Sequence, residues 1–137
     1  MFLLETMVVL EMRRRVPDAH VVRWLSEVDI ESLFVSAISF GEVAAGLEKS
    51  DIDPVFRTRL VRWLEEMRVL FASRTLAIDT AVAVRGGTMY MRLKRRDMDL
   101  LIAATALEHD LTLVTRNVRH FEPTGVRLFN PHEPQAT

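Results

Sequence analysis

Three carboxylates in separate parts of the chain stand where they could bind a metal ion together. Glu5 interrupts the apolar segment FLLETMVVL, Glu42 lies in SFGEVAAGLEK, and Asp99 lies in RRDMDLLIAATALEHD. Carboxylate oxygens are preferred ligands of Mg²⁺ and Mn²⁺. Acidic groups that lie close together repel one another unless a cation is present. If the three segments converge, we therefore expect a divalent metal site formed by Glu5, Glu42 and Asp99.

Two of these carboxylates also have a simpler, local explanation. Ser39 precedes Glu42 by three positions, a spacing typical of a capping box at a helix N-terminus. Asp97 suits the N-cap of the helix that follows, so that Asp99 lies in the first turn, where the helix dipole favours a negative charge. Glu5 has no such explanation, because an unpaired carboxylate at a buried strand end is destabilising or becomes protonated. A bound metal accounts for all three carboxylates together.

The elements that must position these residues follow from apolar periodicity. Short apolar runs at residues 2–4, 33–35, 69–71, 111–114 and 127–129 predict strands. Helical spacing predicts helices at residues 7–14, 19–27, 40–49, 54–67, 80–93 and 98–109. This alternation indicates an α/β fold with one parallel β-sheet and helices on both faces. We expect a single domain over residues 1–131 and a loose C-terminal tail over residues 132–137.

Polar residues follow three of the predicted strands at the points where the strands end. Glu5 follows the first strand, Ser36 and Ser39 follow the second, and residues 115–117, with the sequence Thr-Arg-Asn, follow the fourth. The carboxyl ends of parallel strands meet at one edge of the sheet, where α/β proteins bind their ligands. We therefore expect these residues to lie on the same edge.

The composition excludes some kinds of catalytic site and indicates where the protein acts. The 137 residues include no cysteine and four scattered histidines, which excludes thiolate chemistry and disfavours zinc. The arginines at 13–15 follow the apolar N-terminal run, the reverse of the order in a signal peptide. No apolar stretch approaches the ~20 residues needed to cross a bilayer. These features predict a soluble, cytoplasmic protein without a membrane partner.

The net charge of −1 does not by itself indicate a nucleic-acid binder. The basic residues are nevertheless clustered, which favours local phosphate contacts beside an acidic site. The candidate RNA-binding residues are Arg92, Lys94, Arg95, Arg96 and Arg116. A solvated helix face is the alternative explanation for the cluster between residues 92 and 96.

Three segments resemble successive motifs of VapC-type PIN-domain toxins. They are FLLETMVVLE, LFVSAISFGEVAAGLEK and MDLLIAATALEHDLTLVTRNVRHFEPTGVRLFNP, and the likeness extends from about residue 2 to residue 131. The last segment is the most specific, because it combines a carboxylate that opens an IAATAL helix with a strand ending in TRN. The resemblance implies a PIN-like nuclease domain in which Glu42 and Asp99 are metal-site acids. Asn117 takes the place of a further acidic or amide residue, beside Thr115.

The same resemblance implies a metal-dependent endoribonuclease that is the toxin of a toxin–antitoxin pair. Its cofactor would be Mg²⁺ or Mn²⁺, and its substrate RNA, with transfer RNA as the candidate. Its partners would be a cognate antitoxin and a second copy in a homodimer. Hydrolysis would depend on metal and water, with no protein nucleophile. Trp24 and Trp63 are candidates for the dimer interface or for the core.

The first motif departs from the family pattern and leaves an alternative function open. The family usually has LDTN, whereas this chain has LETM, so that Glu5 replaces an aspartate and Met7 an asparagine. Glu5 keeps the charge on a longer side chain, and Met7 cannot orient a ligand through a hydrogen bond. The alternative is a weakened or inactive PIN module that binds antitoxin or RNA without cleavage.

Overall fold

Five short parallel strands form one sheet in the computed structural model, which describes residues 1–134. The strands are β1 (Phe2–Leu4), β2 (Leu33–Ser36), β3 (Thr75–Leu76), β4 (Thr112–Val114) and β5 (Leu128–Phe129). Their order across the sheet is β3-β2-β1-β4-β5. The predicted α/β class with a parallel sheet is confirmed.

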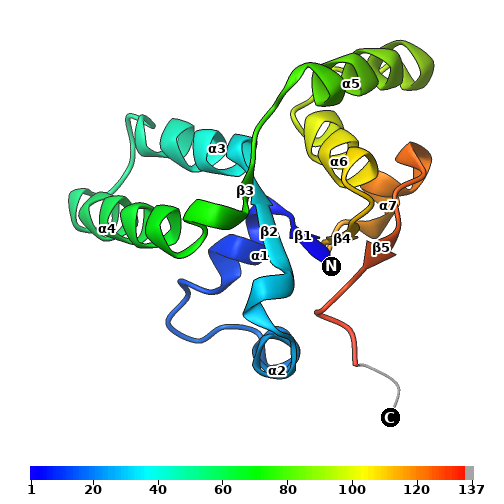
Figure 1. Cartoon of the computed structure of the whole chain (residues 1–137). Coiled ribbons are helices and arrows are strands. Elements are labelled where there is room, and N and C mark those ends of the chain that lie inside the picture. Colours follow the sequence, from blue (N-terminus) through cyan, green and yellow to red (C-terminus); the bar gives the residue numbers. More distant parts are fainter. Residues whose placement is uncertain (135–137) are drawn as a thin grey trace.

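Helices cover both faces of this sheet (Figure 1). In chain order they are α1 (Thr6–Glu11), α2 (Ala19–Glu27), α3 (Ala37–Leu47), α4 (Pro54–Leu70), α5 (Thr80–Leu93), α6 (Asp99–Glu108) and α7 (Val118–Phe121). Asp18, Asp53 and Asp79 begin α2, α4 and α5, and each carboxylate accepts hydrogen bonds from free backbone N–H groups of its helix. Three short 3₁₀ helices, η1 (Ile30–Ser32), η2 (Ala72–Arg74) and η3 (Glu122–Thr124), complete the connections.

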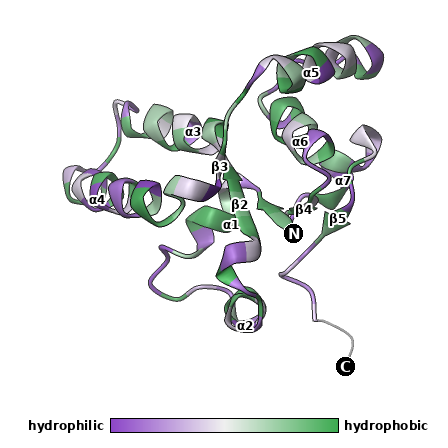
Figure 2. Ribbon diagram, viewed as in Figure 1, coloured by the Kyte–Doolittle hydropathy of each residue, from purple (hydrophilic) through white to green (hydrophobic). Residues whose placement is uncertain are grey.

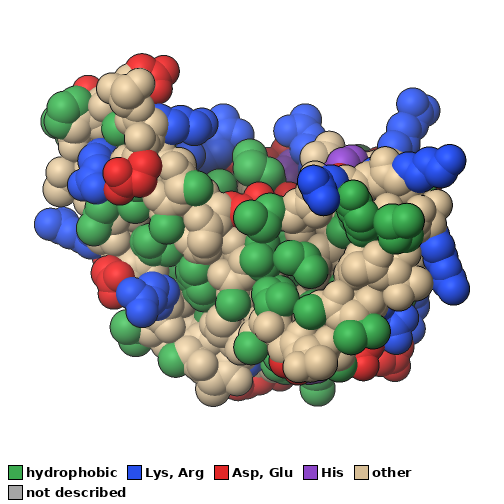
Figure 3. Space-filling view, turned by 90° about the horizontal axis from the view of Figure 1, so that it is seen from above, with side chains coloured by type: hydrophobic (Ala, Val, Ile, Leu, Met, Phe, Trp, Pro, Cys, Tyr) green, Lys and Arg blue, Asp and Glu red, His purple; other side chains and the backbone are tan. Residues whose placement is uncertain are grey.

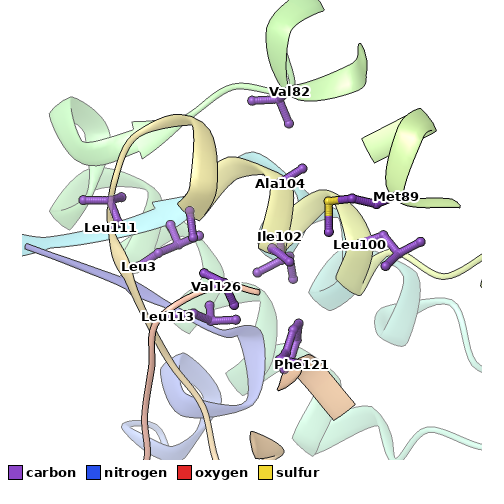
Figure 4. Close-up of a cluster of buried hydrophobic side chains, with 12 residues drawn as sticks. Leu3, Val82, Met89, Leu100, Ile102, Ala104, Leu111, Leu113, Phe121 and Val126 are labelled. Carbon is purple, nitrogen blue, oxygen red and sulfur yellow. The ribbon is translucent and has the colours of Figure 1, made fainter. Parts of the chain in front are cut away.

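Side chains of successive strand residues enter two different cores, one on each face of the sheet. Leu3 and Leu113 pack with α5 and α6 in the cluster drawn in Figure 4. Leu4 and Val114, the next residues along the same strands, pack with α1 and the end of α4. Figure 2 shows hydrophobic residues along the strands and a mixture of hydrophilic and hydrophobic residues along α4. This alternation follows from the two-residue period of a strand and fixes which face each helix covers.

The third predicted strand is wrong. Residues 69–71 form the end of α4 and the residue that follows it, and the strand β3 comes later, at Thr75–Leu76. Phe71 is buried in the core from the end of the helix, which explains the apolar run. A run of three apolar residues does not distinguish a strand from the end of a buried helix. The short helix α7 was not predicted either.

The strand order places a topological switch point between β1 and β4. The chain builds the sheet from β1 through β2 to β3 and then returns to the other side of β1 to form β4 and β5. Ligand sites in open α/β sheets lie beyond the carboxyl ends of the strands at such a point. The residues that follow β1 and β4 are Glu5 and Thr115.

The C-terminal segment contacts the end of α1 through His132. His132, which begins the predicted tail of residues 132–137, is largely buried, with Nε2 3.7 Å from a carboxylate oxygen of Glu11. Residues 135–137 lie outside the described residues, and the division into a domain of residues 1–131 and a tail stays a prediction. Among residues 1–134, no helix has both the length and the apolar character needed to cross a membrane.

Candidate metal centre

Glu5 is a buried carboxylate at the carboxyl end of the central strand. Its backbone N–H donates to the Val114 carbonyl at 3.0 Å, and one carboxylate oxygen accepts the Met7 N–H at 2.9 Å at the start of α1. Only 5% of the residue is exposed. Burial, together with repulsion from Asp99 and Glu42, raises the pKa of Glu5 to about 7, although the Met7 hydrogen bond opposes the change. Glu5 is therefore held close to two other carboxylates.

Glu42 reaches the same place from α3. Its carboxylate accepts a hydrogen bond from the Thr6 hydroxyl at 2.8 Å, and the same hydroxyl lies 2.8 Å from that of Ser39. The expected capping box is not formed, because α3 begins at Ala37 and Ser36 is the N-cap. Burial and repulsion from Asp99 raise the pKa of Glu42, and the Thr6 hydrogen bond lowers it.

Asp99 begins α6 and is held from the opposite side by His120. Oδ2 of Asp99 lies 2.8 Å from Nε2 of His120, in the short helix α7. The side chain of Arg95 donates to the His120 carbonyl at 2.7 Å and pairs with Asp97 at 3.0 Å. Met98, and not the predicted Asp97, is the N-cap of α6. The Asp97 carboxylate belongs to this exposed network, and although burial opposes the change, hydrogen bonds from Arg95 and from the Leu100 N–H lower its pKa. Ligand atoms of Asp97, Asp99 and His120 lie within 4.8 Å of one another, a spacing compatible with a cation.

The segment after β4 closes another side of the site. Thr115 is fully buried, and its hydroxyl accepts the Asn117 N–H at 3.0 Å, which turns the chain into α7. Asn117 and Arg116 are exposed and line a cavity of about 220 Å³ together with Glu5 and Met7. Glu5 and Asn117 therefore line the same cavity. Glu5 also lies within the range of electrostatic repulsion from Glu42 and Asp99.

The predicted RNA-binding residues differ in their surroundings. Arg95 is engaged by Asp97 and His120, whereas Arg96 lies over the Tyr90 ring at 5.1 Å. Arg92 and Lys94 end α5, and Lys94 has a left-handed backbone with φ of 54°. Figure 3 shows the molecule from above, with acidic and histidine side chains in a hollow bordered by Lys and Arg side chains. This distribution places positive charge around a negative centre.

Sequence analysis missed two residues that orient the carboxylates. Thr6 bonds to Glu42 and Ser39, and His120 bonds to Asp99. The position of Thr6 directly after Glu5 was a usable signal, because the first turn after a strand faces the same edge as the strand end. His120 had no comparable signal, since its contact depends on the position of α7, which was not predicted.

The donor set fits a hard divalent cation. Oxygen ligands from carboxylates and an amide are what Mg²⁺ and Mn²⁺ take. The raised pKa of Glu5 reflects its burial first and the repulsion from Asp99 and Glu42 second, and a cation relieves both. Repulsion from Asp99 contributes to the raised pKa of both Glu5 and Glu42.

Comparison with known proteins adds independent information. The model of the family described as "PIN domain" matches residues 2–125. Toxin FitB of Neisseria gonorrhoeae is 33% identical over 139 residues, covering 96% of this chain and 98% of FitB. The protein named VapC ribonuclease Y4jK, from Sinorhizobium fredii, is 30% identical over 142 residues, covering 98% and 99% of the two chains.

Solved structures give the same result. A chain in a structure of FitAB bound to a DNA fragment superposes with a TM-score of 0.83, at 30% identity, covering 99% of both chains. A chain in the crystal structure of FitAcB from Neisseria gonorrhoeae gives a TM-score of 0.82, at 33% identity, covering 96% of this chain and 98% of the other. The similarity therefore extends over nearly the whole length of each chain.

Proposed function

The chain belongs to the PIN domain family as a toxin of the VapC type, and we propose that it is a Mg²⁺- or Mn²⁺-dependent endoribonuclease. One observation carries the proposal. Glu5, Glu42 and Asp99 arise from three distant segments, and repulsion from Glu42 and Asp99 adds to the burial that raises the pKa of Glu5 to about 7. A fold does not maintain three neighbouring carboxylates without a compensating partner, and a divalent cation is the simplest one.

In this proposal Glu5, Glu42 and Asp99 would hold the metal, and Asn117 is a further residue of the catalytic site. A divalent metal held by these residues would supply activation of water and stabilisation of the leaving oxygen of a phosphodiester. The protein contributes orientation. The Met7 N–H fixes Glu5, Thr6 fixes Glu42, and His120 fixes Asp99.

Phosphate contacts in this proposal come from the basic residues around the hollow. Arg116 is the best placed, because it lines the same cavity as Glu5. The other contributors are Arg92, Lys94, Arg95 and Arg96. Guanidinium groups bind phosphate oxygens in pairs, which suits an RNA backbone held beside the metal. Transfer RNA is the first substrate to test.

The partner in this proposal is an antitoxin protein. FitB is named a toxin, and its structures are of the FitAB and FitAcB complexes. We extend that assembly to this chain, with homodimerisation of the toxin and action in the cytoplasm, where its RNA substrate is found. Trp24, one of the two tryptophans considered for the dimer, packs against Phe2 and Phe129 with ring centroids 5.3 and 5.2 Å away. Trp24 is partly buried and packs against the hydrophobic core on this face of the sheet.

A second candidate is a PIN module that binds antitoxin or RNA without cleavage. Met7 favours it, because this residue is 59% exposed in the cavity beside Glu5 and offers no polar group to a ligand. Glu5 adds a methylene to a position where about 1 Å affects positioned chemistry. The two candidates share the fold and the partner and differ only in turnover.

Gel cleavage of total RNA and transfer RNA by the purified chain tests the proposal. We expect cleavage with Mg²⁺ or Mn²⁺, none with a chelator, and loss of cleavage in Asp99→Asn. Asp51→Asn, which alters an exposed aspartate between α3 and α4, is the matched control and should cleave normally. Cleavage that persists in Asp99→Asn would refute the proposed site. Metal binding without cleavage of any RNA would favour the second candidate.

A further inference from the structure

A second carboxylate, Glu11, is buried in the cavity beside the metal centre. Glu11 ends α1 and is 6% exposed. Both of its carboxylate oxygens lie 3.3 Å from a guanidinium nitrogen of Arg14, and one lies 3.7 Å from Nε2 of His132. The proposed reaction does not use Glu11. A buried acid that lines a cavity next to the reaction centre is placed to accept hydrogen bonds from a substrate.

The cavity has two kinds of wall. Met7 and Leu10 supply apolar surface, and Arg13, Arg14 and Arg116 supply positive charge around the buried acid. Its volume is about 220 Å³, and Glu5 of the metal centre lines it as well. Apolar walls, a buried acceptor apart from Glu5 and surrounding cations match the parts of a nucleotide, which are a flat base, polar edges and a phosphate.

His132 gives a separate indication of a ligand in this cavity. Its side chain is 11% exposed and lines the cavity. Within residues 1–134, its Nδ1 is the buried side-chain polar atom that has no hydrogen-bond partner. Buried polar atoms are almost always paired, so Nδ1 of His132 lacks a polar partner that the described residues do not supply.

We propose that this cavity is a nucleoside subsite that prefers guanine, an inference that rests on the proposed endoribonuclease function and names the base it recognises. A carboxylate accepts two parallel hydrogen bonds, and guanine alone among the four bases presents two adjacent N–H donors on its Watson–Crick edge. Adenine and cytosine place an acceptor beside their amino group, which a carboxylate repels. Met7, which cannot serve the metal, covers the face of the base here.

An arginine side chain from a protein would offer the same pair of donors. The charges around the cavity disfavour it, because Arg13, Arg14 and Arg116 repel a guanidinium and attract a phosphate. A nucleotide satisfies the acid and the arginines together, whereas a cationic peptide satisfies the acid alone.

Binding of 5′-mononucleotides in the presence of a chelator tests the subsite without metal or turnover. We expect 5′-GMP to bind the unaltered chain about tenfold or more tightly than AMP, CMP or UMP in calorimetric titration, because a site built for paired donors rejects bases that lack them. Glu11→Gln should remove the preference for GMP, since the amide replaces one acceptor with a donor. Met7→Ala, at an exposed position, should weaken GMP binding and provides a second variant if Glu11→Gln does not fold.

Glu65→Gln is the matched control. Glu65 and Arg68 form the same i,i+3 pair, at 2.9 Å, on the exposed surface of α4, and the variant should bind GMP like the unaltered chain. Equal binding of the four nucleotides, or tighter binding of free arginine than of GMP, would overturn the subsite. Metal-dependent cleavage without nucleotide preference refutes only the subsite. A GMP preference in a chain that cuts no RNA supports the subsite and counts against the ribonuclease function.

Discussion

Asp99 and His120, 21 residues apart in the chain, meet with Oδ2 of the carboxylate 2.8 Å from Nε2 of the imidazole. The same nitrogen lies 2.8 Å from a guanidinium nitrogen of Arg95, so the ring is held between a cation and an anion. This contact couples α6 to α7, and it fixes the orientation of the carboxylate that faces the metal centre. A metal ligand held by such a partner needs less reorganisation when the metal binds.

Replacing His120 should therefore weaken metal binding. We expect His120→Ala to lower the affinity for Mn²⁺ by about tenfold or more, the range seen when partners of metal ligands are removed. Calorimetric titration with Mn²⁺ measures the change. His109→Ala, which alters an exposed histidine at the end of α6, serves as the control and should bind Mn²⁺ normally. Equal affinities in both variants would show that His120 does not orient Asp99.

Thr6 should contribute to stability as well as to the site. Its hydroxyl serves both Ser39 and Glu42, and Thr6 and Ser39 are buried. Thr6→Val leaves both partners without this hydrogen bond, at a cost of about 1–3 kcal/mol in the free energy of unfolding. Urea denaturation of Thr6→Val and of Thr88→Val, an exposed control on α5, measures the difference. A loss no larger than that of the control would mean that the Thr6 hydroxyl is not needed.

Glu5 should make the metal-free protein less stable as the pH rises. The fold raises the pKa of Glu5 from its ordinary value of 4.5 to about 7, so the folded state binds more protons between these values. Stability from this residue is complete below pH 4.5 and is lost as the pH rises to about 7, a total of about 3 kcal/mol. Unfolding in chelator across this range should show the loss, and Glu5→Gln should remove it. The same slope in Glu5→Gln would exclude Glu5 as the titrating group.

Shortening Glu5 should increase turnover. Glu5→Asp keeps the charge and suits the N-cap of α1, while it withdraws the carboxylate by one methylene. We expect the rate of RNA cleavage at saturating substrate to rise about tenfold, because small displacements of a metal ligand slow positioned chemistry strongly. A slower Glu5→Asp would mean that the site is built around the longer side chain. Cleavage by Glu5→Asp alone, with none by the unaltered chain, would identify a decayed nuclease.

The sequence predicted the sheet and the convergence of the carboxylates, because both depend on local patterns. Glu5 follows β1 directly and Asp99 is the first residue of α6. The apolar period of each element therefore predicted on which edge of the sheet each carboxylate lies. The third strand was wrong because Phe71 is buried from a helix end. Contacts such as Asp99 with His120, or Glu11 with His132, depend on how distant segments pack. No local pattern encodes that packing.

Anomalous diffraction from crystals soaked in Mn²⁺ tests most directly whether Glu5, Glu42 and Asp99 bind a metal together. The account predicts a strong anomalous peak within coordination distance of carboxylate oxygens from all three residues, and no such peak in Asp99→Asn crystals. A peak confined to Asp97 and His120, or Mn²⁺ bound away from Glu5 and Glu42, would contradict it.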